Sequence, residues 1–146
     1  MKAPANFIVS PRWLVSVVPK RAPLENYSLV VQAGKIHDLL PAPEADRNYQ
    51  GLPKYELKDH LLIPGLINMH GHAAMTLLRG YADDLPLMQW LEEGIWPAEA
   101  RWVDSDFVRD GTSLAISEML LSGTTTFSDQ YFFPRAAAEA AIEAGM

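Results

Sequence analysis

Two histidines separated by a single glycine, His70 and His72, are the residues of this chain best suited to chemistry. They end a mostly apolar segment, residues 62–72. Because side chains alternate across a strand with a period of two, both imidazoles should point to the same side, as should Leu66 and Asn68. Two imidazoles that project together can bind one divalent metal from one side and leave other coordination positions open.

The surroundings of this pair favour metal binding over a chance His-x-His, which is most often solvated or structural. Pro64 and Gly65 interrupt the chain just before it. Residues 66–69 are apolar on both faces apart from Asn68, which is typical of a buried parallel strand. In α/β barrels, functional residues lie at the carboxyl ends of such strands.

The region around these histidines resembles the amidohydrolase superfamily, most closely the methylthioadenosine/S-adenosylhomocysteine deaminase group and its chlorohydrolase relatives. The superfamily likeness lies in PGLINMHGH at residues 64–72. Likeness to the deaminase group lies in LLRG at 77–80, DDLPL at 83–87 with WL at 90–91, and IWPAE at 95–99. The resemblance is strongest over residues 61–134 and weak over the first sixty residues.

This resemblance implies a site with one divalent metal, zinc being favoured, held by His70 and His72. It also implies that Glu99 contacts the ribose hydroxyls of a nucleoside, since a carboxylate can accept two hydrogen bonds from a vicinal diol. A solvated acid at a helix end is the alternative for Glu99. In the resembled family the other ligands and the proton-transferring Glu lie beyond Met146, so the catalytic residues are unknown in this chain.

The reaction implied by the resemblance is hydrolytic deamination of an adenine nucleoside, such as methylthioadenosine, S-adenosylhomocysteine or adenosine, with release of ammonia. A metal-activated water would attack the purine carbon that bears the amino group. Two alternatives stay open. One is an amidohydrolase acting on another heterocycle, as a guanine, cytosine or s-triazine type deaminase or chlorohydrolase. The other is an inactive truncated fragment.

Several other polar residues are better explained by structure than by catalysis. Asp83 and Asp84 are adjacent and should point apart, so we expect a turn there. Asp129 follows a predicted strand and is expected to make structural hydrogen bonds. His37 and His60 have no partner at metal-ligand spacing and should be structural or exposed.

Aromatic residues and one arginine surround the predicted site. Trp90, Trp96 and Trp102 are expected to belong to the core, with Trp96 the nearest to a purine pocket. Arg79 either orients a loop or pairs with an acid, and the sequence leaves both open.

Composition excludes several classes of partner. The net charge is -6, from 18 acidic and 12 basic residues, which argues against a nucleic-acid partner but not against a nucleoside. Without cysteine there are no disulfides or thiolate ligands. We find no signal peptide or transmembrane span, so a cytoplasmic location without membrane contact is the expectation. A homo-oligomer stays open.

The pattern of elements predicts an α/β fold in two parts. Residues 1–63 are β-rich and, by the resemblance, the N-terminal part of a small β-sandwich domain. The expected strands are 7–9, 13–18, 27–32, 35–40, 55–57 and 61–63, with a hairpin turn at Ala33-Gly34 and a loop at 41–51.

Residues 64–146 alternate strands and helices, as the first two βα units of an amidohydrolase-type (β/α)8 barrel would. The expected elements are strands 66–70 and 124–128, helices 85–93, 105–121 and 134–144, and a loop at 73–84. Asp104 or Ser105 is the expected cap at the start of the second helix. The three helices are expected to end near Gly94, Gly123 and Gly145. Such a barrel takes about 250 residues. The sequence therefore predicts an incomplete barrel, the N-terminal piece of a longer protein, which would be inactive alone.

Overall fold

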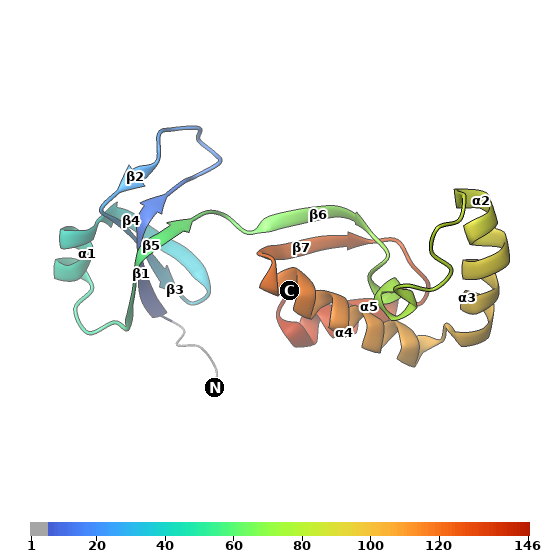
Figure 1. Cartoon of the computed structure of the whole chain (residues 1–146). Coiled ribbons are helices and arrows are strands. Elements are labelled where there is room, and N and C mark those ends of the chain that lie inside the picture. The colour runs from blue at the N-terminus through green and yellow to red at the C-terminus, as the bar shows by residue number, and fades with distance from the viewer. Residues whose placement is uncertain (1–5) are drawn as a thin grey trace. The chain divides into compact units, whose positions relative to one another are not determined.

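The computed structural model describes residues 6–146, which form two compact units divided between Pro64 and Gly65 (Figure 1). The first unit is a five-stranded sheet with a short helix. Its elements are β1 (Asn6–Leu14), β2 (Leu24–Glu25), β3 (Tyr27–Gln32), β4 (Lys35–Pro41), α1 (Ala42–Asn48) and β5 (Lys54–Leu62).

Strand β1 lies inside this sheet. It pairs antiparallel with β2 and β3 and parallel with β5, while β4 pairs with β3. Ile8, Val30 and Leu40 of the strands pack against Ala45 of α1, and all four are buried. The first unit therefore has an apolar core of its own.

The hairpin between β3 and β4 was predicted correctly. Ala33 and Gly34 connect the two strands, and both have positive φ angles, +49° and +76°. A two-residue connection of this kind matches the right-handed twist of the strands that it joins.

Three predictions for this unit were wrong, two of them for strands and one for a loop. The strands expected at 7–9 and 13–18 are replaced by the single strand β1, which ends at Leu14, and those expected at 55–57 and 61–63 are replaced by the single strand β5. Pro11 lies inside β1 because the pairing with β5 shifts register between Pro11 and Trp13. A bulge of this kind accommodates a residue that has no N–H to donate.

The loop expected at 41–51 contains helix α1 instead. Pro43 lies in its first turn, where a backbone N–H has no intrahelical partner and proline is tolerated. Burial of Ala45 against the sheet stabilises this helix, although its length is only seven residues.

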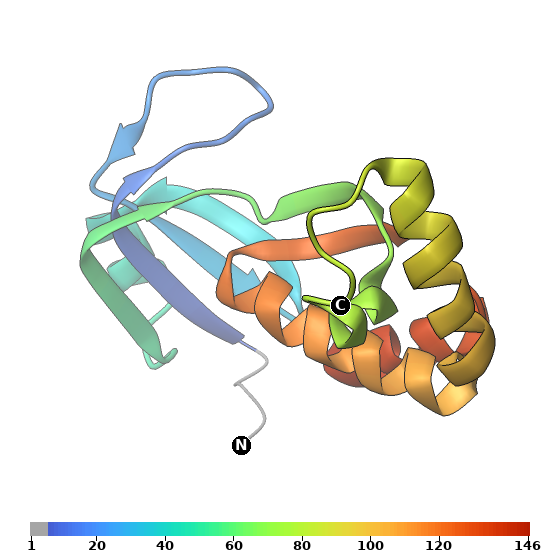
Figure 2. The ribbon, with the colours of Figure 1, turned by 45° about the vertical axis from the view of Figure 1, so that its right-hand side comes forward.

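The second unit is built on a parallel pair of strands, β6 and β7. Its elements are β6 (Leu66–Gly71), η1 (Ala73–Leu78), α2 (Leu87–Gln89), η2 (Trp90–Ile95), α3 (Trp96–Trp102), α4 (Ser105–Leu121), β7 (Thr124–Asp129) and α5 (Pro134–Ala144). Helices α4 and α5 pack together on one side of the strand pair, as Figure 2 shows. Ala74, Val108, Ala136 and Ala137 form the buried core of this unit.

The ends of helix α4 follow the sequence signals. Asp104 caps its start, where Oδ1 accepts a hydrogen bond from the backbone N–H of Phe107 at 2.8 Å. Gly123 follows its last turn with a φ of +87°, and Gly145 follows α5 with a φ of +77°. No helix within residues 6–146 has the length and apolar character needed to cross a membrane.

The pairing of β6 with β7 contains a bulge next to the two histidines. Asn68 pairs with Phe127 and Gly71 with Asp129, so β6 has one more residue than β7 between these pairs. A Cβ at Gly71 would lie 3.2 Å from Nδ2 of Asn68, so these two residues share a side of the strand. The simple alternation expected from Asn68 to the histidines therefore does not hold.

The buried environment predicted for the first barrel strand is wrong for this chain. Leu66, Ile67 and Met69 of β6 are 52%, 63% and 72% exposed. Among the described residues, β6 pairs with β7 alone, so its other edge has no partner strand. The apolar character of β6 therefore does not reflect packing within residues 6–146.

The stretch from 73 to 103 is more helical than expected. The predicted loop begins with the 3₁₀ helix η1, and the predicted helix does not end at Gly94. Instead, α2, the π-helical turn η2 and α3 run without a break. Gly94 lies against the preceding loop, where a Cβ would be 2.7 Å from Cβ of Ala82. The glycine therefore permits a close approach and does not end the helix.

Candidate functional site

His70 and His72 lie at the carboxyl end of β6, with their ring centroids 5.1 Å apart. Nδ1 of His72 is 2.7 Å from the backbone carbonyl oxygen of Gln130. A carbonyl oxygen can only accept, so Nδ1 carries the proton and donates it. In the neutral imidazole, this bond places the lone pair on Nε2, which is the tautomer required of a metal ligand that binds through Nε2.

Two further hydrogen bonds hold the backbone around His72. The N–H of Gln130 donates to the carbonyl oxygen of Gly71 at 2.9 Å. The N–H of Ala73 donates to Oδ1 of Asp129 at 2.7 Å, which confirms the structural hydrogen bonding expected of Asp129. The end of β7 therefore holds the residues on both sides of His72.

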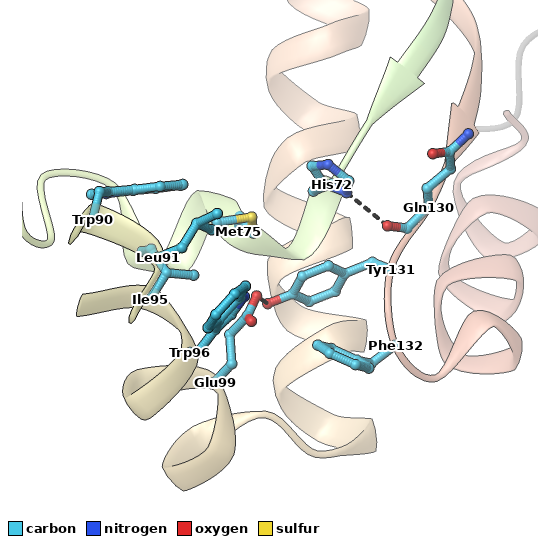
Figure 3. Close-up of a pocket in the computed structure, with 10 residues that line it drawn as sticks. All are labelled: His72, Met75, Trp90, Leu91, Ile95, Trp96, Glu99, Gln130, Tyr131 and Phe132. Carbon is cyan, nitrogen blue, oxygen red and sulfur yellow. Dashed lines mark hydrogen bonds between the residues drawn. The ribbon is translucent and has the colours of Figure 1, made fainter. Parts of the chain in front are cut away.

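A cavity of about 390 Å³ opens beside His72 (Figure 3). Its walls come from η1, from the α2–α3 stretch and from the segment after β7, and most of them are apolar or aromatic. The lining residues are His72, Met75, Trp90, Leu91, Ile95, Trp96, Glu99, Gln130, Tyr131 and Phe132. A small number of polar groups within an apolar wall is typical of small-molecule sites.

Glu99, the second residue predicted for the site, lines this cavity from helix α3 and is half-buried. Its Oε1 accepts a hydrogen bond of 2.7 Å from the hydroxyl of Tyr131, as the close-up in Figure 3 shows. The cavity therefore brings His72 and Glu99 to one site, although they belong to separate elements. His70 does not line it.

Tyr131 lines the cavity but was not predicted from the sequence. Its ring centroid lies 6.1 Å from that of His72. Burial raises the pKa of its hydroxyl well above 10, and the hydrogen bond to Glu99 and the charges of Glu99 and Asp129 raise it further. Its sequence signal is its position two residues after β7, at the same end of the sheet as the histidines.

The tryptophans differ from expectation. Trp96 and Trp102 are 49% and 54% exposed, so the prediction that they belong to the core is wrong. Trp96 and Trp90 line the cavity, and Trp96 does so next to Glu99, one turn away on α3. The suggestion that Trp96 borders a pocket agrees with this position.

The other candidate residues lie outside the cavity. Arg79 pairs with Glu118 of α4 through two hydrogen bonds of 2.9 and 2.6 Å, which settles its role as the partner of an acid. Asp84 lies in a bend with a φ of +66°. His37 packs edge-on against Tyr49 in the first unit, and His37 and His60 are exposed, as expected.

The two histidines supply only part of the protein ligands that a metal site needs. Within residues 6–146, no three His, Cys, Asp or Glu side chains are arranged to hold a metal ion. Catalytic zinc sites have three protein ligands and a water. The adjacent imidazoles and the free Nε2 of His72 fit a divalent metal that also has ligands from elsewhere.

Comparisons with known proteins show the family to which the chain belongs. Residues 61–146 match the amidohydrolase family. Over 99% of its length the chain is 57% identical to the 5-methylthioadenosine/S-adenosylhomocysteine deaminase of Saccharophagus degradans. Over 97% of its length it is 41% identical to the 5'-deoxyadenosine deaminase of Methanococcoides burtonii. It covers 32% of each protein and so spans about a third of the length of these relatives.

Solved structures show the fold to which these residues belong. An adenosine deaminase from Xanthomonas campestris with bound zinc matches 97% of this chain with a TM-score of 0.93 and 40% identity, over 32% of its own length. An atrazine chlorohydrolase from Arthrobacter aurescens, complexed with zinc, matches 96% with a TM-score of 0.85, over 34% of its length. At 23% identity, this second likeness shows the fold alone. The prediction of an α/β fold that begins an amidohydrolase (β/α)8 barrel is confirmed.

Proposed function

The chain belongs to the amidohydrolase family, and we propose that the full-length protein is a metal-dependent deaminase of an adenine nucleoside. Methylthioadenosine, S-adenosylhomocysteine and adenosine are the proposed substrates. Support comes from relatives named for deamination of such nucleosides at 41% to 57% identity. The observation that carries the proposal is that His72 and Glu99 line the same cavity.

His70 and His72 are the proposed metal ligands of this chain. The hydrogen bond from Nδ1 of His72 to Gln130 supports this role, because it orients the ring and, in the neutral imidazole, places the lone pair on Nε2. Zinc is the proposed metal, as in the zinc-bound structural relative. When bound, such a metal supplies a water of lowered pKa that is nucleophilic near neutral pH. Further ligands and a proton-transferring group are proposed to come from the rest of the protein.

Glu99 is the proposed contact for the ribose of the substrate. A carboxylate accepts two hydrogen bonds from a vicinal diol, and a half-buried one does so in competition with less water. Trp96 and Phe132 line the cavity on either side of Glu99 and Tyr131 (Figure 3) and offer aromatic surface to a nucleoside. In the proposed reaction, water adds to the purine carbon bearing the amino group, the C–N bond breaks, and ammonia leaves.

Ammonia release by the full-length protein tests this function. We expect turnover of methylthioadenosine, S-adenosylhomocysteine or adenosine, and loss of turnover in His72→Ala. His60→Ala changes an exposed histidine of the first unit and should retain wild-type rates. Activity confined to guanine, cytosine or an s-triazine would favour the alternative amidohydrolase reactions. A cytoplasmic location and a homo-oligomeric state stay predictions.

A further inference from the structure

The hydrogen bond between Tyr131 and Glu99 joins two segments that are 32 residues apart in sequence. Glu99 comes from helix α3 and Tyr131 from the segment between β7 and α5. Figure 3 shows the hydroxyl of Tyr131 and the carboxylate of Glu99 pointing toward one another within the cavity. Both side chains are half-buried, so this bond is part of the cavity wall.

The two partners differ in freedom of movement. A glutamate side chain loses up to about 2 kcal/mol of rotamer entropy when it is held in one conformation. Tyr131 is more rigid, because its ring packs against Phe132 with a centroid distance of 5.1 Å and lies 6.1 Å from the ring of His72. The tyrosine is therefore the fixed partner, and it restricts the carboxylate.

The chemistry of the bond leaves Glu99 able to bind a ligand. A phenol donates one hydrogen bond, here to Oε1, and Oε2 stays available as an acceptor. A lysine or arginine in this place would neutralise the carboxylate, whereas the uncharged phenol leaves it anionic. A tyrosine phenol, with an ordinary pKa of about 10, is protonated at neutral pH, so the direction of the bond does not change.

We propose that Tyr131 is a positioning residue, which holds Oε1 of Glu99 so that the carboxylate is already oriented to accept hydrogen bonds from a sugar diol. This proposal rests on the proposed nucleoside deaminase function and on the role of Glu99 in it. Tyr131 acts before the substrate arrives, and its contribution is to substrate binding and not to the chemical step.

Steady-state kinetics of the full-length protein test this role. For adenosine, Tyr131→Phe should raise KM about three- to tenfold and leave kcat within about twofold, because the bond that is lost restricts the Glu99 side chain and does not itself contact the substrate. Because Tyr131 acts through Glu99, the double variant Tyr131→Phe/Glu99→Gln should be no worse than Glu99→Gln alone. The proposal would be overturned if the losses of kcat/KM in the two single variants multiplied in the double variant. A fall in kcat at unchanged KM in Tyr131→Phe would also overturn it.

Two further variants separate positioning from general damage. Tyr49→Phe removes the same kind of bond, from a tyrosine hydroxyl to Oδ2 of Asp38 at 3.0 Å in the first unit, and should leave KM unchanged. Glu99→Asp keeps the charge but withdraws it from Tyr131, so its KM should rise as in Tyr131→Phe. A wild-type KM in Glu99→Asp would contradict positioning even if Tyr131→Phe did not fold.

The outcomes also distinguish this proposal from the function on which it rests. A wild-type protein that releases no ammonia from any adenine nucleoside would overturn both. An active nucleoside deaminase in which Glu99→Gln is impaired and Tyr131→Phe has wild-type KM would overturn the positioning role alone.

Discussion

The backbone of Ala74 lies directly against Gly111 of helix α4, so closely that a Cβ at position 111 would be 2.5 Å from the carbonyl oxygen of Ala74. Ala74 is fully buried and comes two residues after His72. Thr76 adds a hydrogen bond of 2.8 Å from its hydroxyl to the carbonyl oxygen of Gly111. Helix α4 therefore supports the segment that follows the predicted metal ligands.

Gly111→Ala should destabilise the protein. The higher helix propensity of alanine should stabilise the protein by up to about 1 kcal/mol. Overpacking against the backbone costs about 1–3 kcal/mol, so the net effect should be a loss of stability. We expect a lower denaturation midpoint and weaker metal retention. Ser113→Ala, on the exposed face of the same helix, should change stability by less than about 0.5 kcal/mol. Equal midpoints for Gly111→Ala and wild type would show that η1 moves without penalty.

His70→Ala and His72→Ala should each lose most of the bound metal of the full-length protein. The rings lie 5.1 Å apart, so we expect that one ion needs both. Elemental analysis of purified protein measures the occupancy. His37→Ala and His60→Ala, at exposed positions of the first unit, are the matched controls and should keep their metal. Full metal occupancy in both variants would contradict the assignment of His70 and His72 as metal ligands.

Glu99→Gln should impair the turnover of nucleosides and leave the turnover of free bases unchanged. Hydrogen bonds to a charged group are worth about 1.5–3 kcal/mol, so kcat/KM for adenosine should fall roughly ten- to a hundredfold. Any activity on adenine should change little. Ammonia release from both substrates measures the difference. Equal losses on base and nucleoside would indicate a structural role for Glu99, and no loss would indicate that Glu99 does not contact the substrate.

Alkaline pH should destabilise the wild type more than Tyr131→Phe. The folded pKa of Tyr131 is raised above its ordinary value of 10, mainly by burial. The stabilisation of its protonated form is therefore complete below pH 10 and is lost as the pH rises above 10 toward the folded pKa. Denaturant unfolding between pH 8 and pH 11 compares the two proteins. A stability difference that does not change over this range would contradict the raised pKa.

Residues 1–146 alone should be inactive and should self-associate. Strand β6 exposes Leu66, Ile67 and Met69, and one of its edges has no partner strand among residues 6–146, a combination that promotes edge-to-edge pairing. Analytical ultracentrifugation and ammonia release measure the two properties. Ile67→Lys places a charge on this face and should reduce the association. A monomer with sharp, dispersed amide resonances would count against the prediction.

Local signals were sufficient for much of the second unit. Asp104, Gly123 and Gly145 mark helix ends through their own backbone preferences, and the structure has those ends where they were expected. Gly94 carries the same signal as Gly123 but has another cause, because it accommodates Ala82. A glycine that ends a helix and one that permits a close contact cannot be separated without the tertiary structure.

The candidate site was predictable only where its residues form a motif. His70 and His72 are recognisable from their spacing on a strand, and Glu99 was suggested by family resemblance. Tyr131 was missed because its role depends on a partner 32 residues away. The faces of β6 were also misjudged, because the bulge between Asn68 and Gly71 depends on register with β7.

The hydrogen bond that fixes the tautomer of His72 has an evolutionary consequence. Its acceptor is the backbone carbonyl of Gln130, which every amino acid possesses. The N–H of the same residue donates to Gly71, so proline is the one substitution that removes a bond. The orientation of the imidazole therefore does not depend on which side chain stands at position 130, although that residue also lines the cavity, and sequence variation there should carry no trace of this role.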